Sequence, residues 1–331
     1  AKLRDIFLKN IKLHLRSDVP LCVNLSGGID SSSIACAIRH LDKDVAINTV
    51  SFVSPGSVDD EEHWIDIVNE HINALPHKIS LDSEGLSNDI DDMFISQGEP
   101  FVSSSVYASY SIFRAVKESG FTVSLDGQGA DEMLAGYDGY PYGVIASMSS
   151  KKNYFGILKF LMAWKKWPGR SYFAAIKSLS NNLSNFFIMR ILYFLSGRDI
   201  KPNWMKASFI PNLKKMHRKS TKILTEEHEI PRRALMGVLR AALTSKGLPG
   251  LLRHGDRNSM RWSIESRVPF LTTELAEFVL GLPEEYLISS NGESKSIFRQ
   301  AMRGVVPDAI LDRRDKIGFK TPELSWVMSE K

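Results

Sequence analysis

The chain has 331 residues, of which 43% are hydrophobic and 24% are charged, and its formal net charge is +4 at pH 7. This composition is typical of a globular protein with one large or two ordinary domains, and it excludes an intrinsically disordered chain. The charge excess is too small to indicate nucleic-acid binding by itself. Without a long apolar run or a secretory signal, the sequence predicts a cytoplasmic protein.

The first predicted element is an amphipathic helix over residues 3–15. Leu3, Phe7 and Ile11 recur every four positions among lysines and arginines, which is the spacing of one helix face. Because the chain starts at Ala1 rather than at methionine, we expect it to be a piece of a longer protein. Cys22 and Cys36 lie among apolar neighbours and are interpreted as buried thiols without a disulfide or a metal.

A strand is predicted at residues 21–25, and Ile34 and Ile38 predict a helix soon after it. The turn between them reads Ser26-Gly27-Gly28-Ile29-Asp30-Ser31-Ser32. Glycines let backbone amides approach a ligand, and these amides, the serine hydroxyls and the start of the helix all favour an anion. The turn lacks the lysine of the common phosphate loop and carries Asp30, which is explained if Mg²⁺ lies between this carboxylate and a phosphate. The structural alternative is a glycine turn with Asp30 as a helix cap.

Further strands and helices alternate along the next hundred residues. Strands are expected at 45–53, 77–80 and 121–125, and helices after the acidic residues 59–62, at 86–95 and at 106–117. This alternation predicts a parallel sheet covered by helices on both faces, with ligands beyond the carboxyl ends of the strands.

A second junction between strand and helix follows the strand at 121–125. It reads Asp126-Gly127-Gln128-Gly129-Ala130-Asp131-Glu132. If this strand lies beside the first, Asp131 faces the same phosphates as Asp30, and two carboxylates from two strand ends are what a protein can supply to magnesium on a nucleotide. Without the first loop, Asp131 and Glu132 would be explained equally well as acidic residues at a helix start.

The segment from Gly143 to about Glu227 is rich in lysine, arginine and aromatic residues. Such a mixture can contact nucleic acid or membranes, but the charges are spread over several predicted helices, so a solvated helical insertion is favoured. Further helices are expected at 232–245, 274–280 and 295–302, the first of them stopped by Gly247 and Pro249-Gly250.

The two junctions, together with Gly136-Tyr137, resemble the synthetase domain of asparagine synthase. Two later blocks are also similar to this family, Asp256–Met260 with Ser263–Leu271, and Arg314–Phe319 followed by Thr321-Pro322. The blocks occur in the family's order from residue 19 to about 322, so the resemblance covers most of the chain.

The resemblance implies an α/β fold built on a parallel-sheet, pyrophosphate-loop core of the adenine nucleotide α-hydrolase type. We expect this core at 1–142, a helical insertion at 143–230 and a helical C-terminal portion at 231–331. Complete members carry a glutaminase domain before the synthetase domain, and we expect one upstream of Ala1.

The resemblance also implies ATP and Mg²⁺ as cofactors and assigns residues to them. ATP contacts are expected at Leu25, Ser26, Gly27, Gly28, Asp30, Ser31, Ser32, Val50, Ser51, Phe52 and Gly127. Asp30 and Asp131 are expected to hold magnesium, and Lys316, with Lys295 as a second candidate, to stabilise charge during both half-reactions. Glu265 is a further catalytic candidate, although a Glu265/Arg267 pair within a turn explains this residue structurally.

Gln128 departs from the family, in which several members carry an acidic or aromatic residue that handles the nucleophile. A glutamine amide does not titrate, so Gln128 cannot act as a base. Either Glu132 or Glu265 takes the proton, or ammonia arrives unprotonated.

The predicted function is ATP-dependent amidation of aspartate with ammonia from glutamine, which yields asparagine, AMP and pyrophosphate through an acyl-adenylate. The same chemistry on a sugar carboxylate, a peptide or a β-lactam precursor stays open, as do a pyrophosphate-loop enzyme that modifies tRNA and a non-catalytic nucleotide-binding homologue. We expect small-molecule substrates and no nucleic-acid or membrane partner, with a homodimer as one option for the assembly.

Overall fold

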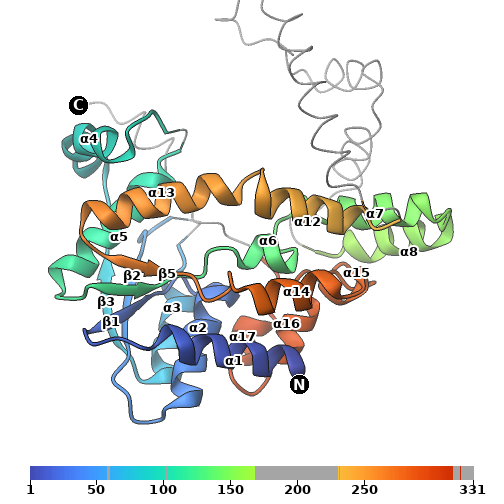
Figure 1. Ribbon diagram of the computed structural model, residues 1–331, viewed down its shortest axis with the longest axis horizontal. Coiled ribbons are helices and arrows are strands. Elements are labelled where there is room, and N and C mark those ends of the chain that lie inside the picture. The colour runs from blue at the N-terminus through green and yellow to red at the C-terminus, as the bar shows by residue number, and fades with distance from the viewer. Residues whose placement is uncertain (58–59, 102, 168–229, 231, 316–320, 322–331) are drawn as a thin grey trace, which may run out of the picture. The chain divides into compact units, whose positions relative to one another are not determined.

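The computed structural model describes residues 1–57, 60–101, 103–167, 230, 232–315 and 321 (Figure 1). The chain forms two compact units. Unit 1 comprises Ala1–Met133, Leu248–Gly281 and Ile297–Lys331, and unit 2 comprises Leu134–Gly247 and Leu282–Ser296. Most of the predicted insertion, residues 168–229, lies outside the described residues, so the predicted boundaries of the three parts stay a prediction.

Unit 1 is built on a parallel sheet of five strands, in the order β3-β2-β1-β4-β5. The strands are β1 (Leu21–Asn24), β2 (Asn48–Phe52), β3 (Leu75–Ile79), β4 (Val123–Leu125) and β5 (Glu265–Arg267). β1 pairs with both β2 and β4, with Val23 opposite Thr49 on one side and Leu125 on the other. The expectation of an α/β fold is therefore confirmed, and the condition set for the second junction, that its strand lies beside the first, is met. The two predicted junctions, which follow β1 and β4, start from the same edge of the sheet.

Helices cover both faces of this sheet (Figure 1). The helices on one face are α1 (Lys2–His14), α2 (Ile29–Leu41), α3 (Glu62–Ile72) and α17 (Asp308–Leu311), of which α2 contacts the other three. The other face carries α4 (Ser83–Gln97), α5 (Ser105–Glu118) and α13 (Leu248–Arg261), which contact one another. Unit 1 also contains α14 (Thr273–Gly281) and most of the short helices α6 (Ala130–Leu134) and α16 (Ser296–Ala301).

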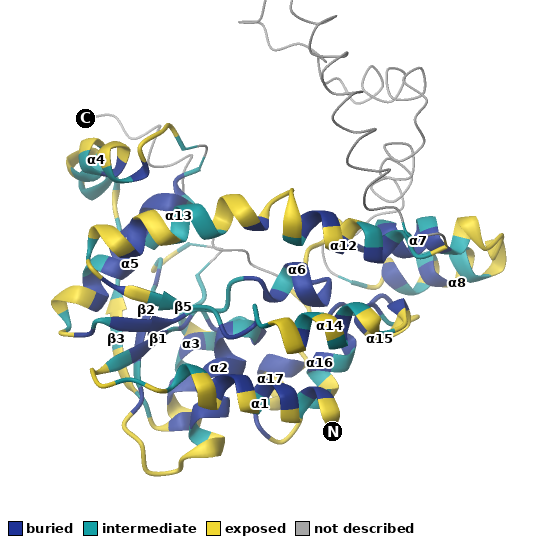
Figure 2. Ribbon diagram, viewed as in Figure 1, coloured by how far each residue is buried: buried dark blue, intermediate teal, exposed yellow. Residues whose placement is uncertain are grey.

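The core of unit 1 lies on both sides of the central strands, which are buried (Figure 2). Between the sheet and α5, a cluster of buried side chains includes Cys22, Val50, Phe113 and Ile264. Near α1, the rings of Phe7, Phe270 and Phe298 pack with centroids 5.0–5.5 Å apart. Cys22 and Cys36 are buried free thiols, as predicted, and burial raises the pKa of Cys36 to about 12.

Two elements differ from the sequence predictions. Glu265 and Arg267 lie in a parallel strand, β5, and not in a turn, because Ser266 pairs with Ser124 of β4. Pro249 and Gly250 lie at the start of α13 rather than in a helix stop. Proline is compatible with the first turn of a helix, where its missing N–H would have no partner within the helix.

Unit 2 contains α7 (Pro141–Ser150), α8 (Tyr154–Trp164), α12 (Ala234–Thr244) and α15 (Glu284–Leu287). α7 and α12 approach closely at Gly143, where a Cβ atom would lie 2.8 Å from the Cα of Leu235. The hydroxyl of Ser147 on α7 accepts a hydrogen bond of 2.8 Å from the backbone N–H of Ala234. Across the described part of the chain, no helix combines the length and apolar character needed to cross a membrane.

Candidate functional site

In the loop between β1 and α2, Gly27 has a backbone angle that favours glycine, whereas Gly28 is extended, with φ of −74°. Gly27 has φ of +71°, and a Cβ atom on it would lie 2.7 Å from the Cβ of Trp64 and 2.9 Å from the backbone nitrogen of Ile65. Only glycine fits this position, both for its backbone angle and for the space. The hydroxyls of Ser26 and Ser31 lie 3.1 Å apart, and that of Ser31 also accepts from the backbone N–H of Ser26 at 3.1 Å. These serines therefore hold the loop in its curved form at the start of α2.

The loop after β4 packs directly against the first loop. A Cβ atom on Gly127 would lie 3.1 Å from the Cβ of Asp30 and 3.2 Å from the backbone nitrogen of Ser31. Gly129 has φ of +84° and packs against the side chain of Leu271. Asp131 then lies in the first turn of α6. The structure thus brings the two predicted junctions together in unit 1.

Asp30 and Asp131 come from these two adjoining loops. Among the described residues, no group of three or more His, Cys, Asp and Glu side chains could hold a metal ion. Magnesium on a nucleotide needs only one or two protein carboxylates, since phosphate oxygens and water supply its other ligands. The donor set fits magnesium on phosphates, and the magnesium role of both residues stays a prediction.

The residues expected to contact the nucleoside are at the ends of β1 and β2. The backbone N–H of Leu25 donates a hydrogen bond of 2.9 Å to the carbonyl of Val50. Val50 has no exposed surface, and its side chain belongs to the core against α5. Val50 therefore exposes neither its side chain nor its bonded carbonyl, and the ATP contact expected at Val50 stays a prediction. The hydroxyl of Ser32 at the first loop is buried, as is that of Ser51, and neither has a hydrogen-bond partner among the described residues.

The described structure does not test the roles of the two predicted lysines. Lys316 lies outside the described residues. Lys295 is 3% exposed, has φ of +55° and belongs to unit 2. Both lysine roles stay predictions.

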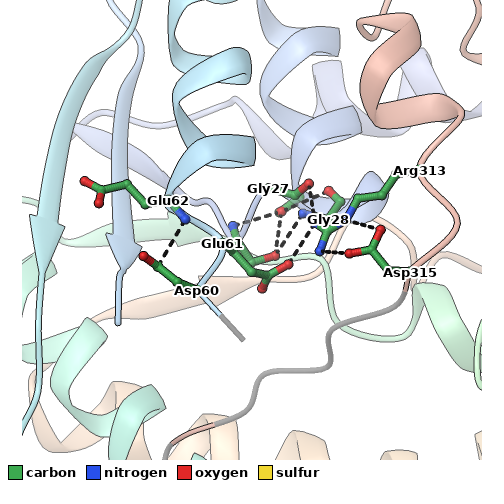
Figure 3. Close-up of polar contacts among 9 residues, drawn as sticks. Gly27, Gly28, Asp60, Glu61, Glu62, Arg313 and Asp315 are labelled. Atoms are coloured by element: carbon green, nitrogen blue, oxygen red, sulfur yellow. Dashed lines mark hydrogen bonds and ion pairs between the residues drawn. The ribbon is translucent and has the colours of Figure 1, made fainter. Parts of the chain in front are cut away.

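Arg313 is a residue at the predicted phosphate loop, Ser26–Ser32, that the sequence reasoning missed (Figure 3). Its Nη1 lies 2.9 Å from Glu61 Oε1 and donates to the carbonyl of Gly27 at 3.3 Å. Its Nε and Nη2 pair with the Asp315 carboxylate at 3.1 and 3.0 Å. The guanidinium also stacks 4.8 Å from the ring centroid of Trp64.

This contact anchors the chain three positions before Lys316 to the phosphate loop. The side chain of Arg313 is 5% exposed and that of Glu61 12% exposed, so the pair is largely removed from water. A buried charge must be paired to be tolerated. No local pattern in the sequence marks Arg313, because its neighbour Arg314 is also basic and Glu61 reads as an ordinary acidic residue at a helix start.

A cavity of about 330 Å³ opens beside the second loop within unit 1. It is lined by residues of α5, α13, β5 and the end of β4, among them Asp126 and Gln128. Asp126 accepts a hydrogen bond of 2.9 Å from Asn24 Nδ2 and one of 2.5 Å from Ser266 Oγ. Burial raises the pKa of the Asp126 carboxyl above its usual value. Gln128 Oε1 is buried and has no hydrogen-bond partner among the described residues.

Glu265 lines the same cavity, but its carboxylate is engaged. Glu265 Oε1 lies 2.6 Å from Arg267 Nε, and the hydrogen bond from Arg267 lowers the pKa of Glu265. Its side chain is 61% exposed. A lowered pKa makes Glu265 a weaker base. The pair with Arg267 that explains Glu265 structurally is formed, although it lies in a strand and not in a turn. Glu132, the other suggested base, is 2% exposed.

The chain was compared with protein families and with curated proteins. A family model described as asparagine synthase matches residues 2–331. Asparagine synthetase [glutamine-hydrolyzing] 1 of Bacillus subtilis is 28% identical over 342 residues, which cover 99% of this chain and 50% of that protein. Amidase chry2 of Gibberella zeae is 24% identical over 368 residues, or 98% of this chain and 52% of the relative. The chain thus spans about half the length of these curated relatives.

Proposed function

Because this chain belongs to the asparagine synthase family, we propose that it is the ligase part of an enzyme that converts a carboxylate into an amide with ATP. The carboxylate would attack the α-phosphate and form an acyl-adenylate with release of pyrophosphate, and a nitrogen nucleophile would then displace AMP. The observation that supports this most directly is the contact between the two junctions at Gly127 and Asp30, because Asp30 and Asp131 then come from adjoining segments at one edge of the sheet.

The residues of the two loops divide the work in this proposal. The backbone of Ser26 to Gly28 and the start of α2 would bind the phosphates, and Asp30 and Asp131 would hold Mg²⁺ on them. Bound magnesium would supply positive charge that offsets the repulsion between the two reacting anions. Lys316, with Lys295 as a second candidate, would stabilise charge during both half-reactions.

For the substrates, we propose aspartate as the acceptor and ammonia derived from glutamine as the nucleophile. Relatives named asparagine synthetase [glutamine-hydrolyzing] support this choice, and a glutaminase domain upstream of this chain would supply the ammonia. A second candidate keeps the chemistry but changes the acceptor to a sugar carboxylate or a peptide. The relatives named amidase and the glutamine at position 128 favour it. We place either reaction in the cytoplasm, with no nucleic-acid partner.

The proposal is tested by product formation with Mg-ATP, ammonium and aspartate. The purified chain, and the full-length protein with any upstream domain, should form AMP and asparagine in equal amounts. Asp30→Asn should lower this activity at least about 100-fold, since it removes a charge at the phosphates. Asp44→Asn is the matched control, because Asp44 is exposed between α2 and β2.

Each outcome separates the candidates. AMP without asparagine, or no turnover despite ATP binding, would reject aspartate and move the search to other carboxylates. Unchanged turnover in Asp30→Asn would reject the assignment of this loop to the phosphates.

A further inference from the structure

We propose that the cavity beside β4 and β5 binds the nitrogen nucleophile as a primary ammonium group and that Asp126 accepts its proton. This inference rests on the proposed amide-forming function and assigns one half of it, delivery of the nucleophile, to a defined place. Gln128 has no titrating side chain, and Asp126, two positions before it, supplies the proton acceptor instead.

The location of the cavity fits this role. Asp126 directly precedes Gly127, the residue that packs against Asp30 in the phosphate loop. The cavity therefore adjoins the place where the phosphates of an adenylate would bind. A nucleophile held there would meet the activated carboxyl group over a short path.

The charge of the cavity favours a cation over a carboxylate substrate. Its lining includes Asp126, Asp256 and Glu265, and no lysine, arginine or histidine among the described residues lines it. Glu265 is already paired with Arg267, whereas no cation in the described structure pairs with Asp126. A substrate with two carboxylates would be repelled here, and an ammonium group would be attracted.

Asp126 is held ready for such a partner. Asn24 and Ser266, from the two neighbouring strands, each donate to one of its oxygens at 2.9 and 2.5 Å, which fixes the carboxyl group. Both donors are neutral, so they do not cancel its charge. Burial alone raises the pKa of Asp126, with the buried thiol of Cys22 nearby on β1. A cation that enters the cavity would favour the ionised form of Asp126.

Gln128 supplies the second acceptor. Its Oε1 is a buried oxygen without a hydrogen-bond partner among the described residues, and Gln128 lines the same cavity. An ammonium group carries N–H donors and no acceptor, so it complements both Asp126 and Gln128. A buried polar atom left without a partner costs free energy, which a bound donor would recover.

The size of the cavity admits two sources of this group. A volume of about 330 Å³ far exceeds the roughly 30 Å³ that one water molecule occupies in the liquid. Free ammonium would enter together with water, and a small organic primary amine would fill the space itself. Both present the same group to Asp126.

The ammonium group gives one proton to the Asp126 carboxylate and becomes a neutral amine. The amine lone pair forms the C–N bond at the acyl carbon, and the bond from that carbon to the AMP oxygen breaks, so the electron pair leaves with AMP. The nitrogen loses a second proton to water as the amide forms.

The test compares nucleophiles that differ in protonation. Hydroxylamine is mostly neutral at pH 8, so it needs no proton acceptor before attack, whereas ammonium and methylamine are mostly protonated there. We expect Asp126→Asn to lower kcat/KM with ammonium about 100-fold, the usual contribution of a general base. Hydroxamate formation from hydroxylamine in the same variant should stay within about threefold of the unsubstituted protein, because it needs no such base.

A second variant covers the case that Asp126→Asn does not fold, which its thermal unfolding would reveal. Ser266→Ala keeps the carboxylate but removes one donor that stabilises its ionised form, so it should lower the ammonium rate several-fold and spare hydroxylamine. In the unsubstituted protein, a higher kcat/KM for methylamine or ethanolamine than for ammonium would identify an organic amine as the source. The reverse order would identify ammonium.

The failures of the inference and of the proposed function are distinguishable. If both variants affect ammonium and hydroxylamine equally, Asp126 is not the proton acceptor, although the ligase function stands. If the unsubstituted protein forms no hydroxamate with Mg-ATP and any carboxylate tested, the proposed function fails and the inference falls with it.

Discussion

At the scale of single residues, Arg313 shows how a charged side chain can support a binding loop without belonging to its motif. It joins the carbonyl of Gly27, the carboxylate of Glu61 and the carboxylate of Asp315 in one buried arrangement. Trp64 packs against the guanidinium with its ring, and its Cβ atom occupies the space that a side chain at position 27 would need. The shape of the phosphate loop therefore depends on a residue near the far end of the chain.

Replacement of Arg313 should affect both stability and ATP binding. Arg313→Met removes the guanidinium that pairs with the largely buried Glu61, and breaking a buried pair typically costs about 3 kcal/mol or more of unfolding free energy. We also expect a higher KM for ATP with a smaller change in kcat, and partial rescue by Arg313→Lys, which keeps the charge but loses the fork of donors. Urea unfolding and steady-state kinetics measure the two effects.

The matched control for this prediction is Arg303→Met. Arg303 also pairs with two carboxylates, Asp308 and Asp312, but its side chain is 44% exposed, and exposed pairs contribute at most about 1 kcal/mol. Equal losses in the two variants, or an unchanged KM for ATP in Arg313→Met, would show that Arg313 does not support the loop.

The glycine turn after β1 could be expected from the sequence because its information is local, and its phosphate role stays a prediction. Two glycines and three serines within a few positions, between a strand and a helix, suffice to indicate an anion site. The pair between Arg313 and Glu61 joins residues 252 positions apart, and the hydrogen bonds on Asp126 come from two other strands. Such contacts arise only from the folded chain, so no spacing rule could have found them.

At the scale of elements, helices such as α1, α2 and α12 followed from apolar periodicity and the central strands from short apolar runs, whereas two other elements showed no such pattern. β5 has only three residues, Glu265–Arg267, all of them polar or charged, so it carries no strand pattern. It exists because it pairs with β4. α13 begins with Leu248-Pro249-Gly250, a sequence that indicates a stop unless the helix starts there.

Close packing of α7 on α12 gives a prediction for unit 2. Gly143→Ala would place a methyl group 2.8 Å from the Cα of Leu235, a distance that requires the helices to move apart. Overpacking of this kind typically costs about 1–3 kcal/mol. Gly139→Ala is the control, because a Cβ atom at Gly139 would meet no atom within 4 Å. Thermal unfolding of both variants checks the prediction, and equal midpoints would contradict the close approach.

At the scale of the whole molecule, the residues of both loops lie in unit 1, although the chain leaves this unit at Met133 and returns at Leu248. The same unit receives β5 and the segment with Arg313 from the later part of the sequence. Two widely separated parts of the chain therefore have to be in place before the candidate site is complete. The described residues of motifs that are far apart in the sequence therefore belong to one compact unit.

Mg-ATP should consequently stabilise a defined set of backbone amides. A ligand that binds only the folded state raises the free energy of the openings that destroy its site, by about 2.7 kcal/mol at a hundredfold excess over Kd. We expect slower hydrogen exchange at Leu25–Ser32, at Gly127–Asp131 and around Arg313, which frame the proposed phosphate site from three parts of the chain. α8 in unit 2 carries none of these residues and serves as the internal reference. Protection confined to α8, or protection of the first loop without the second, would contradict a shared phosphate site. In the Arg313→Met variant, loss of the Mg-ATP-dependent protection at the first loop would connect Arg313 to ATP binding rather than to stability alone.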